Sequence, residues 1–319
     1  MPFAGRALFN LLRTKAESGD SQGIKEWQIR DYRALSIDQL FDGLLDLGID
    51  LDLDQFEVAA ENVDAPEEIA AAMAPPGEPY DKVYLYIFEL WRRLFDDRET
   101  ISIFCDELDN ALLNYDDDPI TNGEVVYGLL KELVSILEQN VALGQKPKTL
   151  FKLIAEFLSH DLESSIYNYI QDLIEQDRHM AASEITENFM PYVELKIWFE
   201  LLNIKLMHGV SSSDATARVS LFLEKVDMAK DLDLYMELLH FLNQTGYKEL
   251  FESVYAKAVK LVSRRDEYIE CLDILHEYFH LNDKKKEEKL VRGLLESLVS
   301  DQEKPVTIKE KQIVLELVK

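Results

Sequence analysis

Hydrophobic residues recur every three or four positions through most of the chain, which is the period of an amphipathic α-helix. Ser36 offers an N-cap for one such helix. The apolar stripe of that helix comprises Leu40, Phe41, Leu44, Leu45 and Leu47. DLDQFEVAAENV (52–63) and PEEIAAAMA (66–74) predict two short helices, the second opened by Pro66 and two acids. APPGEPY at 74–80 is the strongest break and indicates a subdomain boundary.

Three longer helices are predicted over 80–95, 101–115 and 124–142. The segment VYLYIFELWRRLF in the first of them is apolar almost all round, which is typical of a central, buried helix. Residues 116–119 separate the second helix from the third, and GQKP at 144–147 ends this part of the chain.

From residue 148 onward, helical segments begin at regular intervals. Their predicted starts lie near residues 149, 162, 180, 192, 213, 230, 247, 265 and 284, mostly 12–21 residues apart. This is the rhythm of antiparallel helical hairpins, and no alternating run predicts a strand. The sequence therefore predicts an all-α fold: an acidic helical module at 1–145, followed by a stacked α-hairpin, superhelical array at 146–319.

The clearest hairpin unit is YMELLHFLNQTGYKELFESVYAKA. Its informative positions are Tyr235, Leu238, Leu242, Gly246, Tyr255 and Ala258. This unit resembles a tetratricopeptide repeat, whose first helix carries an aromatic residue, then Leu-Gly, then Tyr, and whose second carries Ala, Phe and Ala. Leu239 stands where that family has Gly, and Phe251 where it has Ala. These larger side chains are expected to push the two helices of the pair apart.

Turns equivalent to Gly246 can be placed at Asp177, Gly209 and Asn282, with successive spacings of 32, 37 and 36 residues. Gly and Asn tolerate the left-handed backbone that ends a helix. The helix before Gly209 offers matching residues at Trp198, Leu201 and Leu202. The resemblance covers about residues 162–300. It implies a concave surface that takes up a helix or an extended segment of a partner protein.

The chain is strongly acidic, with a formal net charge of −27 over 319 residues. Residues 1–145 hold 11 basic and 30 acidic side chains, a net of −19, and residues 146–319 hold 23 and 31, a net of −8. Such a surface repels nucleic-acid phosphates and anionic lipids, and it attracts basic proteins. The alternative is that the charge only keeps the protein in solution.

Two features bear on the compartment. Cys105 and Cys271 both lie in apolar helical patterns, so two buried thiols in a reducing, cytoplasmic setting are expected. No stretch is long and apolar enough for a membrane span. Residues 1–16 carry Arg6, Arg13 and Lys15 without an acid, which leaves a targeting or secretion segment as an alternative. An ordinary first helix, docked through Phe3, Leu8, Leu11 and Leu12, fits as well.

His276, Glu277 and His280 match H-E-x-x-H, in which two imidazoles hold zinc and the glutamate activates water. A third ligand is missing, because no histidine-bearing continuation follows, and Glu303 lies in a charged loop. Both histidines lie on the flank of an apolar helix face, where hydrogen-bonded histidines are common. The basic run 284–286 is followed at once by acids, which is typical of a solvated helix face.

Asp50, Asp52, Asp54 and Glu61 occupy positions 1, 3, 5 and 12 of a calcium-binding EF-hand loop. However, Gln55 replaces the glycine of the sharp turn, and the neighbouring leucines suit a hydrated loop poorly. Asp54 is more naturally the N-cap of a helix that begins at Gln55. We therefore assign no metal, cofactor or catalytic residue.

The leading hypothesis is a non-enzymatic protein–protein interaction protein, namely an adaptor, scaffold or chaperone-like binder whose partner carries a basic or helical segment. One alternative is a zinc-dependent hydrolase that uses His276, Glu277 and His280. Another is a structural subunit that associates with itself through apolar faces. The sequence alone names neither the partner-binding residues nor the oligomeric state.

Overall fold

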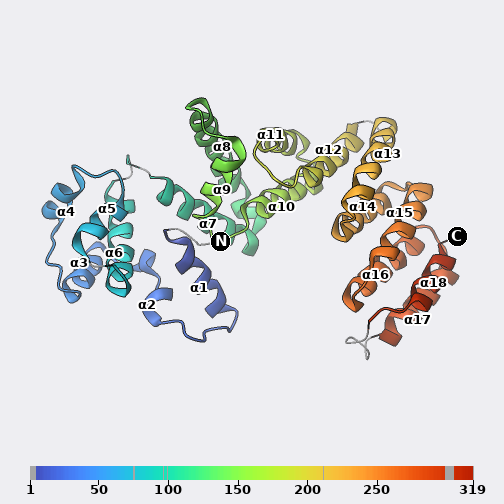
Figure 1. Ribbon diagram of the computed structural model, residues 1–319, viewed down its shortest axis with the longest axis horizontal. Coiled ribbons are helices and arrows are strands. Elements are labelled where there is room, and N and C mark those ends of the chain that lie inside the picture. Colours follow the sequence, from blue (N-terminus) through green and yellow to red (C-terminus); the bar gives the residue numbers. More distant parts are fainter. Residues whose placement is uncertain are drawn as a thin grey trace. The chain divides into compact units, whose positions relative to one another are not determined.

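The computed structural model describes residues 5–74, 76–95, 97–98, 100–210, 212–298 and 305–318, apart from the side chains of 209–217. Throughout these residues the chain forms helices and loops without a strand, which confirms the all-α prediction (Figure 1). Within the same ranges, none of the helices combines the length and apolar character needed to cross a bilayer.

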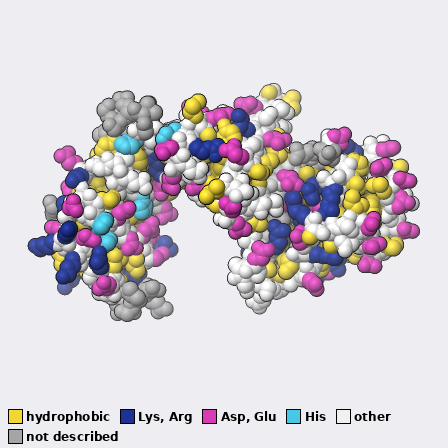
Figure 2. Space-filling model, turned by 180° about the vertical axis from the view of Figure 1, so that it is seen from behind, with side chains coloured by type: hydrophobic (Ala, Val, Ile, Leu, Met, Phe, Trp, Pro, Cys, Tyr) yellow, Lys and Arg dark blue, Asp and Glu magenta, His cyan; other side chains and the backbone are white. Residues whose placement is uncertain are grey.

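Contacts between residues group the chain into two compact units. The N-terminal unit comprises Met1–Ile170 and Glu187–Glu194, and the C-terminal unit comprises Gln171–Thr186 and Leu195–Lys319. The predicted division into 1–145 and 146–319 stays a prediction, because a grouping by contacts does not show which segments fold alone. Acidic side chains are spread over the visible face of each unit (Figure 2).

The N-terminal unit contains α1 (Ala7–Glu17), α2 (Glu26–Ile29), the 3-10 helix η1 (Tyr32–Ala34), α3 (Ile37–Asp46), α4 (Leu53–Ala60), α5 (Pro66–Met73), α6 (Glu78–Leu94), α7 (Ile101–Asp117), α8 (Pro119–Ala142) and α9 (Pro147–Ala155). Two helices have residues in both units, α10 (Leu162–Glu175) and α11 (His179–Phe189). The C-terminal unit continues with α12 (Lys196–Val210), α13 (Ser212–Ala229), α14 (Leu232–Thr245), α15 (Lys248–Leu261), α16 (Arg265–Leu281), α17 (Lys285–Leu298) and α18 (Ile308–Leu317).

Helix α6 is the centre of the N-terminal unit, as its all-round apolar sequence predicts. Every residue from Val83 to Trp91 is buried, and α3 and α5 pack against it. Its one buried acid, Glu89, accepts hydrogen bonds from Arg92 at 2.6 Å and Arg93 at 2.5 Å. The carboxylate is thus paired within its own helix, which offsets the cost of burying a charge.

Local capping signals place most helix starts in this unit. Ser36 is the N-cap of α3 and accepts a hydrogen bond from the backbone N–H of Gln39, as predicted. Pro66 opens α5, also as predicted. The assignment of Asp54 as the N-cap of α4 is wrong. Asp52 caps α4 through the backbone N–H of Gln55, so the helix begins two residues earlier than expected.

The C-terminal unit is built of paired helices. α12 packs on α13, α14 on α15, and α16 on α17, and the first helices α12, α14 and α16 contact one another in turn (Figure 1). The predicted starts from 149 to 284 lie within four residues of the observed ones. Helix α18 was not predicted, although Thr307 and Glu310 form a capping box at its start.

The structure confirms two of the predicted turns and corrects the other two. Gly246 has a left-handed backbone with φ of 74° and ends α14, and Asp177, with φ of 59°, follows α10. After α16 the left-handed residue is Asp283, with φ of 55°, so placing it at Asn282 is wrong by one position. Gly209 lies within α12, so placing a turn there is wrong; α12 ends at Val210 and α13 begins at Ser212.

The two large residues that depart from the tetratricopeptide pattern are fully buried. Leu239 lies in the core of α14 and α15, and the ring of Phe251 stacks on that of Tyr278 with centroids 4.0 Å apart. Because Tyr278 belongs to α16, Phe251 fills the space between one hairpin and the next. The larger side chain therefore serves the contact between successive hairpins.

Both cysteines are free and fully buried, as predicted. Burial raises the pKa of Cys271 to about 12, and its Sγ lies 3.7 Å from Met236 Sδ. A thiol held in its neutral form is a poor nucleophile, so Cys271 is a packing residue.

Helix α1 docks on the N-terminal core through part of the expected face, because Leu12 packs against the core as predicted and Leu8 does not. Ala7 and Phe9 are buried, whereas Leu8 is 41% exposed, and Phe3 lies outside the described residues. Arg6 is 5% exposed, lies over the rings of Tyr32 and Phe88, and is 3.7 Å from Asp106. Because Arg6 is buried against these side chains, it contributes to the packing of the N-terminal unit. The targeting role of this segment stays a prediction.

Asp109 of α7 ties three parts of the N-terminal unit together. It is 2% exposed and accepts hydrogen bonds from Asn10 of α1 at 2.8 Å and from Ser159 Oγ at 2.6 Å, and its Oδ1 lies 2.6 Å from His160 Nδ1. Burial opposes ionisation of Asp109, but the contacts from His160, Ser159 and Asn10 outweigh it and lower the pKa. The same hydrogen bond raises the pKa of His160.

We expect a His160→Gln variant to lose most stability at mildly acidic pH. The pKa of His160 is raised above 6.5 in the folded state, so its contribution is complete below 6.5 and fades as pH rises through the folded value. The pKa of Asp109 is lowered, so its contribution fades only as pH falls below 3.8 toward the folded value. Urea unfolding should show a loss of about 1–3 kcal/mol near pH 5 and a smaller one near pH 8. The control is His179→Gln, a half-buried histidine whose ion-pair partner Asp177 is 95% exposed, and equal losses at both pH values would contradict the assigned pairing.

Candidate functional site

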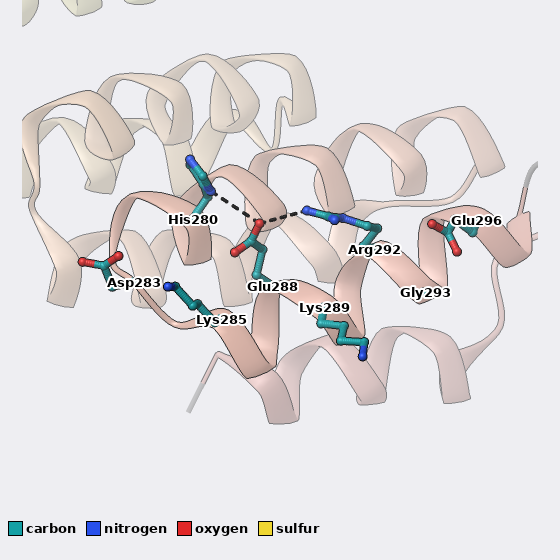
Figure 3. A pocket seen from close by; sticks show the side chains of 8 residues that line it. All are labelled: His280, Asp283, Lys285, Glu288, Lys289, Arg292, Gly293 and Glu296. Atoms are coloured by element: carbon teal, nitrogen blue, oxygen red, sulfur yellow. Dashed lines mark hydrogen bonds and ion pairs between the residues drawn. The ribbon is translucent and has the colours of Figure 1, made fainter.

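The two histidines of the H-E-x-x-H motif lie on α16 and face Glu288 of α17. Figure 3 shows His280 beside Glu288. Glu288 Oε1 lies 3.6 Å from His276 Nε2 and 3.4 Å from His280 Nδ1, and it accepts a hydrogen bond from Arg292 at 3.0 Å. The pocket of about 530 Å³ beside them is lined by His280, Asp283, Lys285, Glu288, Lys289, Arg292, Gly293 and Glu296. Cations and carboxylates alternate in it, so the pocket largely neutralises its own charge.

Glu277 faces a different helix from the two histidines. Its Oε2 accepts a hydrogen bond from Asn243 of α14 at 3.4 Å and lies 3.9 Å from His240 Nδ1. Arg292 Nη2 lies 3.4 Å from His276 Nε2, so a cation already occupies the space beside that nitrogen. Among the described residues, no three His, Cys, Asp or Glu side chains are grouped to hold a metal ion, and Glu303 lies outside them. The hydrolase hypothesis stays a prediction that this geometry does not favour.

The EF-hand-like spacing of acids does not form a calcium loop. Asp52 caps α4, and Asp54 and Glu61 lie at opposite ends of that helix. Seven residues of helix separate the last two by about 10 Å along the axis, so they cannot converge on one ion as positions 5 and 12 of the loop would.

A buried lysine joins three alternate helices, α10, α12 and α14, through residues of the C-terminal unit. Lys205 of α12 is 7% exposed, and its ammonium donates to Gln171 of α10 at 2.7 Å and to Glu237 of α14. Burial lowers the pKa of Lys205, against the attraction of Glu237. Since a buried charge without partners is costly, Lys205 fixes how these helices lie against one another.

A second polar bridge continues this line from α14 to α16. Asn243 is 7% exposed and donates to the carbonyl oxygen of Ile274 at 3.1 Å as well as to Glu277. The bridged residues are 31 to 37 positions apart in the sequence, which is one hairpin. We call this line the array face; it comprises Gln171, Lys205, Glu237, His240, Asn243 and Glu277.

The α14–α16 part of this surface exposes two carboxylates, and two further acids near it, Asp266 and Glu267, pair with Arg264. Glu277 is 49% exposed, and Glu270 of α16 is exposed near it in sequence. Partial burial raises the pKa of Glu270, His240 opposes the rise, and the carboxylates of Asp233, Asp266 and Glu267 add to it. A cation brought to these carboxylates would be stabilised by all of them.

The array face could not be named from the sequence, although one signal pointed to it. Lys205 is the single charge in the apolar run LLNIKLM, and a charge there needs a partner. The distances of 34 residues to Gln171 and 32 to Glu237 match the predicted hairpin period. This agreement between sequence spacing and hairpin period indicates a contact only when the helices are known to stack.

No family model, curated protein or solved structure matches this chain. The site is therefore argued from its own residues.

We expect Glu237→Gln to destabilise the C-terminal unit more than Lys205→Met. The first substitution leaves the buried ammonium without its carboxylate, at a cost of about 1–4 kcal/mol, whereas the second removes the charge and keeps an unbranched side chain. Urea unfolding of both variants and of the double variant measures the difference. A larger loss for Lys205→Met would contradict the assigned pairing.

Proposed function

We propose that this chain is a non-enzymatic protein–protein interaction protein, an adaptor, scaffold or chaperone-like binder. Its C-terminal hairpins, which are similar to tetratricopeptide repeats, bind a basic segment of a partner protein. The observation that carries the proposal is the array face, in which the first helices of successive hairpins are bridged by Lys205 and Asn243 into one surface.

The charge of this surface favours a basic partner. Lys205 is buried and already paired, whereas Glu270 and Glu277 are exposed and lie close to further carboxylates. Lys or Arg side chains of a partner would relieve this repulsion, and long-range attraction would speed the encounter.

The dimensions favour a segment rather than a small molecule. Packed helices lie about 8–10 Å apart, so the three first helices α12, α14 and α16 span roughly 20 Å. A helix of about 13 residues, at 1.5 Å per residue, covers that length. A segment laid across the array can therefore contact every hairpin in turn.

Binding of a labelled peptide of alternating Lys and Ser tests this proposal, with fluorescence anisotropy as the readout. We expect the Glu270→Gln, Glu277→Gln double variant to bind about fivefold more weakly than the native chain at low salt, since each exposed ion pair contributes about 0.5 kcal/mol. The native affinity should also fall as salt is raised.

The matched control is the Glu132→Gln, Glu138→Gln double variant of α8, which removes the same charge from the N-terminal unit. It should bind the peptide like the native chain. Equal weakening by both double variants would mean that net charge alone attracts the peptide, and the array face would lose its role.

A further inference from the structure

The connection between α3 and α4 exposes leucines and aspartates in alternation. We call residues 45–54, LDLGIDLDLD, the α3–α4 corner. Leu45 is 55% exposed, Leu47 37% and Leu53 41%, although a helical corner buries such side chains when it has a neighbour to bury them against. These three exposed leucines lie within nine residues of one another, and the described residues of the chain leave all three open to solvent.

The backbone of the corner is well fixed. Gly48, with φ of +82°, makes the turn after α3, and the N–H of Ile49 donates to the carbonyl oxygen of Leu44 at 3.0 Å. Asp52 caps α4, and the ring of Phe41 meets that of Phe56 edge to face at 6.3 Å. The exposed leucines are thus held in place before any partner arrives, which lowers the entropic cost of binding.

The aspartates of the corner have no cation of their own. Asp46, Asp50 and Asp54 are exposed, and in the described part of the chain none of them pairs with a basic side chain. Residues 34–81 contain 13 acidic side chains and neither Lys nor Arg. Acidic and hydrophobic side chains lie side by side toward the right-hand edge of this unit in Figure 2, where α3 and α4 are found.

We propose that the α3–α4 corner is a docking surface for an amphipathic helix of a partner protein that carries Lys and Arg beside its apolar stripe. The exposed leucines contact the apolar stripe of the partner helix, and the aspartates pair with the Lys and Arg side chains that flank this stripe. A surface this acidic repels nucleic acid and anionic lipid, so charge complementarity selects a basic protein segment. This surface is separate from the array face, and the proposal does not depend on the proposed function.

The test uses a labelled 18-residue peptide with Leu at helical spacing and Lys or Arg elsewhere, added to the full chain. The Leu45→Ser, Leu53→Ser variant should weaken binding at least about tenfold, since two anchoring leucines are removed. The Asp50→Asn, Asp54→Asn variant should weaken binding about fivefold and flatten its salt dependence. Circular dichroism checks that the variants keep their helices.

Three controls make the outcome specific. Leu143→Ser removes an exposed leucine outside the corner and should leave peptide binding unchanged. Glu270→Gln with Glu277→Gln removes acids at and beside the array face and should weaken binding of this peptide much less than the corner variants do. A peptide with Ser in place of Leu should bind the corner at least about tenfold more weakly. The proposal is overturned if the corner variants bind the amphipathic peptide like the native chain, or if the native chain does not bind it saturably.

A second copy of this chain is the alternative occupant of the α3–α4 corner. Light scattering of the native chain and of the Leu45→Ser, Leu53→Ser variant tests for it. We expect the same mass for both at every concentration used. An oligomer that forms in the native chain and is lost in Leu45→Ser, Leu53→Ser would overturn the proposal in favour of self-association.

Discussion

Each helix of this protein is stable because a neighbouring helix covers its apolar face. The helices are 4 to 24 residues long, and isolated helices of this size are marginal in water. Both cysteines are free, so covalent cross-links contribute nothing. Packing between helices, both consecutive ones such as α5 and α6 and non-consecutive ones such as α14 and α16, therefore carries the fold. The buried polar groups act within that packing. Asp109 and Lys205 each join elements that the apolar contacts alone would leave free to slide.

The acidic balance is compatible with this fold because most carboxylates stay at the surface. The exceptions among the described residues, Glu89, Asp106 and Asp109, are paired at hydrogen-bond distance. Burial raises the pKa of Glu270, His240 opposes the rise, and three neighbouring carboxylates add to it. In the proposed complexes, the cations of a basic partner lie along a row of hairpins at the array face and flank an apolar contact at the α3–α4 corner.

The sequence predicted what depends on neighbouring residues. Caps and breakers such as Ser36 and Gly246 act within one turn, so the helix order and most starts followed from the pattern. The sequence pattern favoured Asp54 as the N-cap of α4. The N-cap is instead Asp52, because its side chain accepts a hydrogen bond from the backbone N–H of Gln55 and the Gln55 side chain accepts one from the backbone N–H of Asp52. The pairings of Lys205 and His160 could not be foreseen, since their partners lie 32 to 51 residues away. The role of the corner was hidden for a related reason: only the fold shows which leucines stay exposed.

The central claim is that exposed acidic surfaces of this chain bind basic protein segments. Hydrogen exchange of the full chain, with and without the Lys- and Arg-bearing amphipathic peptide and then with the Lys-Ser peptide, tests it most directly. The account predicts slower exchange at residues 45–54 with the first peptide and along α14 and α16 with the second. Exchange that is unchanged in both places, or slowed only around the α16–α17 pocket, would contradict it.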